Sequence, residues 1–335
     1  MKIALDAMGG DRGSDMAVRG ALAAVQYRRD LQVTLIGPRE VLEKQLAENG
    51  SVDGEGGRVS VHHASEVITM DDSPVEAVRK KKEASIMVGF ELVKTGQADA
   101  VVSAGNSGAT MAAAVKKLGR LPGIARPGIA SFFPTLKKPV MLMDIGANVD
   151  CRAQHLYQFA VMAASCSQLL LDYDHPRIGL LSIGAETGKG NALVKETYEL
   201  LKQSPLNFIG NVEGRDVYRG DVDVIVCDGF VGNISLKISE GLAEAAMQMI
   251  KKEIMKSWRA KLGYLLMRHA FAGFKKQVDY AEYGGAPLLG INGTGIICHG
   301  ASNAVAIRNA IDVAANMVRN KVNEAIVQAL GEYAI

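Results

Sequence analysis

Residues 98–119 read ADAVVSAGNSGATMAAAVKKLG, and this stretch decides the fold. An apolar run at 98–102 is followed by SAGNSGA at 103–109 and then by small residues with helical spacing. This order predicts a buried strand that passes through a glycine-rich turn into a helix. A strand, a turn and a helix of this kind form the basic unit of an α/β protein.

Eight further apolar runs have the length and composition of buried strands, and stretches with helical spacing separate most of them. The runs are KIALDA (2–7), LQVTLIG (31–37), RVSVHHA (58–64), KPVMLMDIG (138–146), PRIGLLSIG (176–184), LNFIGN (206–211), VDVIVCDG (222–229) and TGIICHG (294–300). The helical stretches are 15–29, 40–48, 74–96, 107–119, 153–171, 190–203, 233–256 and 302–331. The alternation predicts a doubly wound α/β fold with a mostly parallel sheet and helices on both faces. We expect one domain over residues 1–335, with room for two lobes, because no Pro- or Ser-rich linker divides the chain.

The composition excludes several classes of protein. A net charge of +2 and an aromatic content of 5% argue against nucleic acid as a partner. The four cysteines are too scattered for a zinc site, so we expect reduced thiols and no metal at Cys151, Cys166, Cys227 and Cys298. We find no signal-peptide pattern and no apolar stretch long enough to cross a membrane, and therefore predict a cytoplasmic protein.

Turns built from glycine with Asp, Asn or Ser follow the predicted strands. Besides SAGNSGA they are DAMGGD (6–11), DIGAN (144–148), GNVEG (210–214), DGFVGN (228–233) and NGTGIICHG (292–300). Ligands bind outside the carboxyl ends of parallel strands, so we expect these turns to meet at one edge and form one site. The alternative is that tight turns and helix caps simply require these residue types. We single out as supporting turn residues Asp6, Gly9, Gly10, Asp144, Asp228 and Gly285.

The turn at 103–109 has the features of an anion site. A helix that begins near Ser107 leaves backbone amides unpaired at its positive end, and glycine lets a ligand approach them. Neither a Walker lysine nor a GxGxxG pattern is present, which disfavours a nucleotide. The turn therefore fits phosphate or carboxylate as its ligand.

Seven motifs in this order carry a resemblance to a known family. They are DAMGGD (6–11), DDSPVEAVRKKK (71–82), ADAVVSAGNSGAT (98–110), MDIGAN (143–148), GNVEGRD (210–216), DGFVGN (228–233) and DYAEYGGAPLLGINGTGIICHG (279–300). From about residue 2 to 331 the chain resembles the acyl-ACP:phosphate acyltransferases (PlsX) of bacterial phospholipid synthesis. It departs from the family pattern at Ser14, Asp15, Ser107 and Ala301, at the outer edge of the site.

The resemblance implies an activity and its partners. The reaction is phosphorolysis of a long fatty acyl thioester on acyl carrier protein, which yields acyl phosphate and the free carrier. The implied fold is similar to that of phosphotransacetylases and isocitrate-type dehydrogenases, without a metal or organic cofactor. A homodimer, peripheral association with the inner face of the cell membrane, and product transfer to a membrane-bound glycerol-3-phosphate acyltransferase are also implied.

The residues fit such chemistry because phosphate is itself a nucleophile and needs no catalytic triad. Given the resemblance, we predict that phosphate is bound by Ser103, Gly105, Asn106, Ser107 and Gly108. Donors to the thioester oxygen, each worth roughly 2.7–4 kcal/mol in known cases, are expected from Asn148 and Asn233. His299 or Lys189 would assist the leaving thiolate, although His299 can equally be a packed histidine and Lys189 a solvated one. Asp144 and Asp228 orient donors or cap their turns.

A basic segment at 251–276 combines eight Lys/Arg with large apolar residues. We interpret it as an amphipathic hairpin, broken at Gly263 and Gly273, that contacts an anionic membrane surface. A dimer arm or a docking face for the carrier protein are the alternatives. The residues expected to contact the membrane are Trp258, Leu262, Leu265, Leu266 and Phe271.

A second basic run, from Arg79 to Lys82, is either a solvated helix face or a contact for the acidic carrier protein.

Three rival functions remain. A short-chain phosphate acetyl- or butyryltransferase would use CoA thioesters, and a decarboxylating dehydrogenase would need acidic metal ligands. A membrane-associated organiser of lipid synthesis would keep the basic hairpin and have no turnover.

Overall fold

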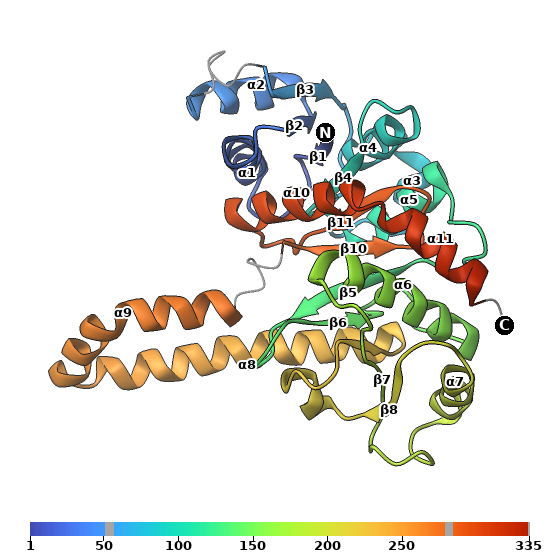
Figure 1. Ribbon diagram of the computed structural model, residues 1–335. Helices are drawn as coiled ribbons and strands as arrows, with labels where there is room; N and C mark the ends of the chain where they lie inside the picture. The colour runs from blue at the N-terminus through green and yellow to red at the C-terminus, as the bar shows by residue number, and fades with distance from the viewer. Residues whose placement is uncertain (51–56, 279–283, 334–335) are drawn as a thin grey trace.

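The computed structural model describes residues 1–50, 57–278 and 284–333. Eleven strands within these residues form a single sheet, in the order β3-β2-β1-β4-β11-β10-β5-β6-β9-β7-β8 (Figure 1). The first half of the chain supplies β1 (Lys2–Asp6), α1 (Ser14–Tyr27), β2 (Gln32–Gly37), α2 (Arg39–Glu48), β3 (Val59–His63), α3 (Pro74–Lys80), α4 (Ser85–Lys94), β4 (Ala100–Ser103) and α5 (Ser107–Leu118). The predicted α/β class is thereby confirmed.

The second half of the chain builds the other end of the sheet and then returns to its middle. It consists of β5 (Gly128–Phe133), β6 (Val140–Met143), α6 (Ala153–Leu171), β7 (Ile178–Leu181), α7 (Ala192–Lys202), β8 (Phe208–Val212), the 3₁₀ helix η1 (Gly214–Tyr218), β9 (Val224–Val226), α8 (Gly229–Met255), α9 (Trp258–Val278), β10 (Ala286–Leu289), β11 (Thr294–Ile297), α10 (Ala304–Arg319) and α11 (Val322–Glu332). The helix predicted over 74–96 is two helices, α3 and α4, and that over 302–331 is also two, α10 and α11.

Two strands that the sequence pattern did not single out reverse the direction of the sheet. β10 is antiparallel to both β11 and β5, and β5 is antiparallel to β6. β4 is parallel to β11, whereas β9 is parallel to β6 and β7 is parallel to β9. The strands in the two halves of the sheet therefore run in opposite directions. Turns that follow β1, β4 and β11 therefore lie at one edge, and turns that follow β6, β8 and β9 lie at the opposite edge. The expectation that all the turns meet at one edge is wrong.

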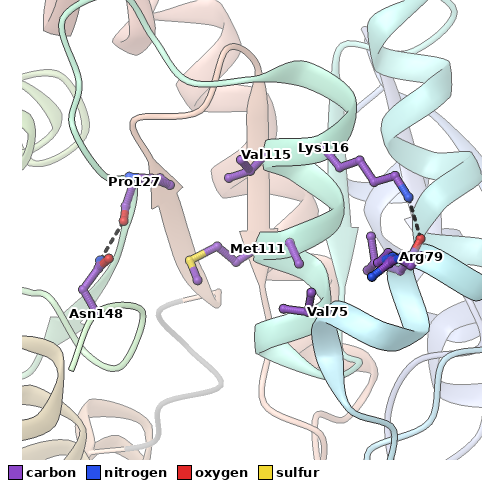
Figure 2. A pocket seen from close by; sticks show the side chains of 9 residues that line it. Val75, Arg79, Met111, Val115, Lys116, Pro127 and Asn148 are labelled. Atoms are coloured by element: carbon purple, nitrogen blue, oxygen red, sulfur yellow. Dashed lines mark hydrogen bonds between the residues drawn. The ribbon is translucent and has the colours of Figure 1, made fainter. Parts of the chain in front are cut away.

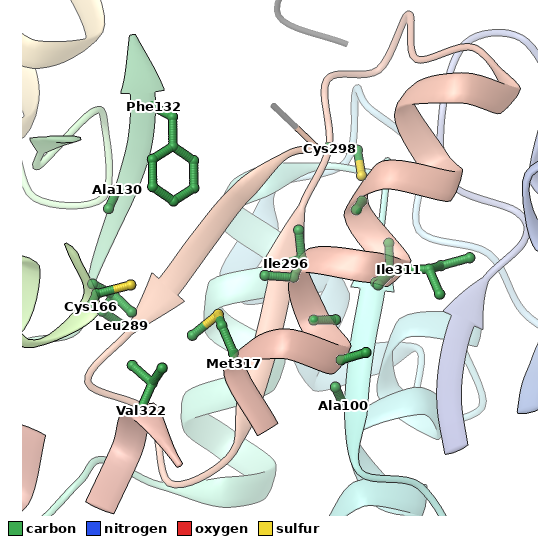
Figure 3. Packing of buried hydrophobic residues seen from close by; sticks show 14 of the residues in the cluster. Ala100, Ala130, Phe132, Cys166, Leu289, Ile296, Cys298, Ile311, Met317 and Val322 are labelled. Atoms are coloured by element: carbon green, nitrogen blue, oxygen red, sulfur yellow. The ribbon is translucent and has the colours of Figure 1, made fainter. Parts of the chain in front are cut away.

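Helices cover both faces of the sheet, as predicted. One apolar layer packs side chains of α1, α6, α10 and α11 against strands, and Figure 3 shows Ile296, Ile311 and Met317 within it. The other layer includes apolar residues of α3, α4 and α5, among them the fully buried Phe90. At roughly 25 cal/mol for each Å² of apolar area removed from water, these two layers are the main source of stability.

The basic segment at 251–276 is part of a long helical arm. α8 and α9 lie side by side and project away from the sheet (Figure 1). The chain turns at Lys256–Ser257, so the expected breaks at Gly263 and Gly273 are wrong; both glycines lie inside α9. Leu262, Leu265 and Leu266 are all at least half exposed, and Trp258 is exposed beneath the Arg259 guanidinium. Phe271 is half-buried and its ring packs on that of Tyr264.

Candidate functional site

A buried hydrogen bond ties together the ends of the neighbouring strands β1 and β4. The hydroxyl of Ser103 donates to the Asp6 carboxylate at 2.7 Å, and both side chains are buried. The same carboxylate accepts from the backbone N–H groups of Met8 and Gly9 at 3.2 Å. Because its hydroxyl is used inside the fold, Ser103 supports the turn that follows it.

Three glycine turns interlock at this edge of the sheet. A side chain on Gly9 would place its Cβ 2.5 Å from the backbone nitrogen of Gly105, so only glycine allows this approach. Gly10 has a φ of +98°, and the next amide, that of Asp11, donates to the carbonyl of Gly300 at 2.8 Å. The turns after β1, β4 and β11 thus form one surface, as the sequence predicted for these three.

Asn106 caps α5 and satisfies only part of the backbone amides in its first turn. Its Oδ1 accepts from the Ala109 amide at 3.0 Å, and its Nδ2 donates to the carbonyls of Met70 and Asp72 at 3.1 and 3.3 Å. The Asn106 side chain therefore anchors two segments to each other. Within the described part of the chain, the amides of Ser107 and Gly108 have no hydrogen-bond acceptor. The prediction that this turn binds phosphate stays a prediction, and it now rests on these amides.

The turn after β6 is organised around Asp144, which is fully buried. Its Oδ1 accepts from the amides of Ile129, Gly146 and Ala147 at 3.0 to 3.1 Å. Its Oδ2 accepts from the amide and from the side chain of Asn148, at 2.7 and 2.9 Å. Burial raises the pKa of the Asp144 carboxyl, and the donors from Ala147 and Asn148 oppose this effect. Asp144 thus orients this turn.

The side chain of Asn148 also forms hydrogen bonds at this turn. Its Nδ2 donates to the Pro127 carbonyl at 2.8 Å as well as to Asp144, so both of its side-chain N–H groups have acceptors. The predicted role of Asn148 as a donor to the substrate would require one of these bonds to break. In this structure Asn148 ties the turn after β6 to the residue that precedes β5.

The first turn of α8 lies directly on this turn. Asp228 caps the helix by accepting from the amides of Phe230 and Val231 at 3.0 Å. Gly229 and Gly232 face the backbones of Asn148 and Asp144, where a Cβ would come within 2.7 and 1.9 Å of an atom. Asn233, on the same turn of the helix, is exposed and lies next to Gly146. Its side-chain amide is thereby presented at the surface of the turn.

The helix α8 also contacts the turn after β11, at the opposite edge of the sheet. Two turns beyond the α8 N-terminus, the Nζ of Lys237 lies 3.3 Å from Nε2 of His299, in the turn after β11. The ammonium is also paired with Glu240 at 2.8 Å. Nδ1 of His299 accepts from the Ala301 amide at 3.1 Å. α8 therefore reaches both groups of turns, and His299 is exposed as an acid would need to be.

Lys189 and Gly285 lie apart from this contact. Lys189 is exposed in the loop after β7, at the same edge as Asp144, and its backbone amide donates to the carbonyl of Glu186. Gly285 precedes β10 with a φ of +88°, close to the Ile296 side chain. The preceding motif residues 279–283 lie outside the described residues. No group of three or more His, Cys, Asp or Glu in the described part of the chain is arranged to hold a metal ion.

An apolar pocket of about 380 Å³ runs along α5 beside these turns. In Figure 2, Met111 and Val115 of α5 lie on one side of it, and Pro127 with Asn148 lies on the other. Arg79 of α3 and Lys116 add basic groups at its margin, where Lys116 donates to the Val78 carbonyl at 2.9 Å. The remaining lining residues are Val75, Val78 and Ala112. A pocket of this size and lining suits an apolar ligand with a polar end.

Comparisons with known proteins identify the chain. A family model described as "Fatty acid synthesis protein" matches residues 1–325. Proteins named phosphate acyltransferase from Nitratidesulfovibrio vulgaris and Trichlorobacter lovleyi are each 53% identical to it, covering 98% and 99% of this chain and 94% and 95% of their own. The chain belongs to the phosphate acyltransferase family. The predicted enzyme class and its place in fatty acid and lipid synthesis are thereby confirmed, with phosphate and an acyl donor as substrates.

Solved structures agree on the fold of this phosphate acyltransferase. A phosphotransacetylase from Streptococcus pyogenes superposes with a TM-score of 0.59 at 20% identity, over 99% of this chain and 94% of its own. A 4-hydroxythreonine-4-phosphate dehydrogenase from Klebsiella pneumoniae gives 0.52 at 12% identity, over 95% and 97%. The likeness to the phosphotransacetylase fold is confirmed.

Sequence reasoning missed two features of the site. Lys237 lies four residues after Asn233, a spacing that places both on one face of α8, and this signal was available in the sequence. The pocket along α5 was not predictable, because it forms between α3, α5 and the Pro127 turn, which are distant in sequence.

Proposed function

We propose that the protein transfers a long fatty acyl group from acyl carrier protein to inorganic phosphate, and that the acyl phosphate serves phospholipid (phosphatidic acid) synthesis. The observation that carries the proposal is the apolar pocket along α5. It begins within about one turn of the helix N-terminus, where the amides of Ser107 and Gly108 have no acceptor in the described part of the chain. An acyl chain in this pocket would bring its thioester next to a bound phosphate.

Phosphate would bind at the N-terminus of α5. The helix dipole and the amides of Ser107 and Gly108 favour an anion there, and the glycines allow its close approach. The Asp6–Ser103 hydrogen bond and the Asn106 cap hold these amides in place before the ligand arrives. The turn is therefore preorganised, which reduces the free-energy cost of binding.

Attack and departure use groups from both halves of the chain. A phosphate oxygen attacks the thioester carbonyl carbon, and the carbonyl oxygen becomes an oxyanion that the exposed amide of Asn233 would stabilise. Collapse of this intermediate breaks the carbon–sulfur bond and releases the carrier's thiolate. A proton from His299, or the charge of Lys189, would assist that step.

The partners follow from the surfaces around the site. Within the basic run, Lys80 pairs with Glu76 and Lys81 with Asp72, which leaves Arg79 and Lys82 without ion-pair partners in the described structure. We propose that these two contact the acidic carrier protein. For the arm we propose contact with the anionic inner face of the cell membrane, near the glycerol-3-phosphate acyltransferase, since its apolar residues are exposed. No helix among the described residues is long and apolar enough to cross a membrane.

An alternative binding partner for the arm is a second copy of the chain. Besides the apolar residues of α9, the arm exposes apolar residues of α8, such as Ile238 and Leu242. Exposed apolar residues on both helices of the arm fit a homodimer interface equally well. Loss of vesicle binding without a change in mass after reversal of the Lys/Arg charges in 251–276 would assign the basic residues to the membrane.

The experiment that tests the function uses the purified protein with palmitoyl acyl carrier protein and phosphate. Hydroxylamine traps acyl phosphate as a hydroxamate, which we expect only when phosphate is present. Asn233→Ala should lower kcat by about 100-fold, while Gln248→Ala, an exposed amide farther along α8, should leave it unchanged. No hydroxamate, or a faster reaction with acetyl-CoA, would overturn the long-chain proposal.

A further inference from the structure

The contact between Lys237 and His299 brings the two halves of the sheet together at one point. Lys237 belongs to α8, which follows β9, whereas His299 follows β11 at the opposite edge. The 3.3 Å separation of their nitrogens means that α8 delivers a positive charge to the edge where Asp6 and Ser103 lie. The Lys237 side chain, from the second half of the sheet, thus lies at the turns of the first half.

The chemistry of the pair is unusual because both groups donate. Nδ1 of His299 accepts from the Ala301 amide, so a neutral ring carries its proton on Nε2. The ammonium of Lys237 has three N–H donors and no acceptor. The two groups, 3.3 Å apart, place N–H donors and a positive charge at one point of the surface, which favours an anion there.

The pair lies beside the glycine turn at the start of α5. Ile297 and Ser103 are paired across β11 and β4, and the amide of Cys298 donates to the Ser103 carbonyl at 2.7 Å. His299 is the next residue. The carbonyl of Gly300 in turn accepts from Asp11 of the first glycine turn.

We propose that Lys237 is a further phosphate-binding residue, which neutralises charge on the phosphate held at the α5 N-terminus. The proposal rests on the proposed function and adds a residue to its phosphate site. Lys237 would accompany His299 on the side of the phosphate away from the helix amides. Phosphate binding would then join the two halves of the chain through one anion.

Glu240 positions the ammonium without neutralising it permanently. The Lys237–Glu240 pair spans 2.8 Å, but the lysine side chain is 53% exposed. Exposed ion pairs of this kind contribute little, so the ammonium can move toward phosphate at small cost. Lysine suits this role because its charge is compact and its stem is flexible.

Initial-rate kinetics of Lys237→Met test the proposal. Removing one charge-assisted contact should raise the KM for phosphate about tenfold or more, while the KM for palmitoyl acyl carrier protein changes less than twofold. Lys237→Arg should recover part of the phosphate affinity. Lys44→Met, which removes an exposed lysine paired with Glu48 on α2, is the matched control and should change neither constant.

A binding measurement keeps this test separate from the proposed function. Phosphate should raise the melting temperature of the wild-type protein, and Lys237→Met should reduce that rise while its melting temperature without phosphate stays the same. An unchanged phosphate KM, or an undiminished melting-temperature rise in Lys237→Met, would overturn the assignment. A wild-type protein that binds phosphate but forms no hydroxamate would instead overturn the acyl transfer and leave Lys237 as a phosphate ligand.

Discussion

A β-carbon on Gly232 would lie 1.9 Å from the carbonyl oxygen of Asp144. The first turn of α8 therefore rests directly on the backbone of the turn that holds Asn148, with no space for a methyl group. Farther along the same helix, Nζ of Lys237 lies 3.3 Å from Nε2 of His299.

Replacing Gly232 with alanine should destabilise the protein and abolish acyl transfer, because backbone atoms cannot move aside as a flexible side chain can. Overpacking of this kind typically costs about 1–3 kcal/mol. Gly241→Ala is the matched control, since nothing lies within 4 Å of its added Cβ in the same helix. That variant should be more stable by roughly 0.5–1 kcal/mol. Equal melting temperatures for the two variants would show that α8 does not rest on Asp144.

Removal of the Asn106 side chain should cost more than removal of an ordinary helix cap. Asn106→Ala loses the bond to the Ala109 amide and both bonds to the segment containing Met70 and Asp72. A cap alone is worth about 0.5–2 kcal/mol. Asn191→Ala removes a cap of the same kind from α7 and nothing else that the structure shows. Denaturant unfolding of the two variants measures the difference, and equal losses would contradict the anchoring role.

The pair of Asp72 and Lys81 should make stability depend on acid pH. The Lys81 ammonium, followed by the Thr69 amide, lowers the pKa of Asp72 to about 2. Because this value is below that of the unfolded chain, near 4, the pair's contribution is present above about pH 4 and is lost as the pH falls toward 2. In Lys81→Met, the midpoint of the Asp72 titration, followed by the NMR chemical shift of its carboxyl carbon, should move closer to pH 4. An unchanged midpoint would mean that the ammonium does not contact Asp72 in solution.

The four thiols should react slowly in the folded protein. Burial raises the pKa of Cys151 to about 11 and those of Cys166 and Cys298 to about 12, and it also raises that of Cys227. At pH 8 only about one Cys151 in a thousand would be a thiolate. Ellman's reagent should therefore release its chromophore over hours in buffer and within minutes in denaturant. Rapid reaction of the native protein would show that Cys151 is more accessible than this structure allows.

The features predicted correctly from sequence are those confined to one strand, turn and helix. The units around Ser103, Asp144 and Asp228 follow from apolar runs and capping residues, which act over a few positions. The reversal of the sheet could not be predicted in this way. β5 lies between Pro127 and Pro134, and β10 contains Pro287, so a proline at or inside each run disfavours a strand in the sequence pattern.

Relations between distant segments account for the remaining differences. Ser103 and Asn106 were expected to offer their side chains to phosphate, yet both are used by Asp6, Met70 and Asp72. The sequence carries no local sign of such partners. The Lys237–His299 contact likewise depends on the antiparallel strands β10 and β5, which place the α8 N-terminus and His299 at opposite edges of the sheet.

The central claim is that the pocket along α5 holds the acyl chain of the donor. The most direct measurement is the rate of acyl phosphate formation from palmitoyl and butyryl carrier protein in Ala112→Trp, which fills the pocket, and in Val115→Trp, which narrows it from its exposed side. With unchanged melting temperatures, we predict that kcat/KM for palmitoyl falls at least about tenfold in Ala112→Trp, in line with the loss of a few buried methylenes, and less in Val115→Trp. The kcat/KM for butyryl carrier protein should stay within twofold of the wild-type value in both variants. Equal losses for both donors, or no loss for palmitoyl, would show that the acyl chain binds elsewhere.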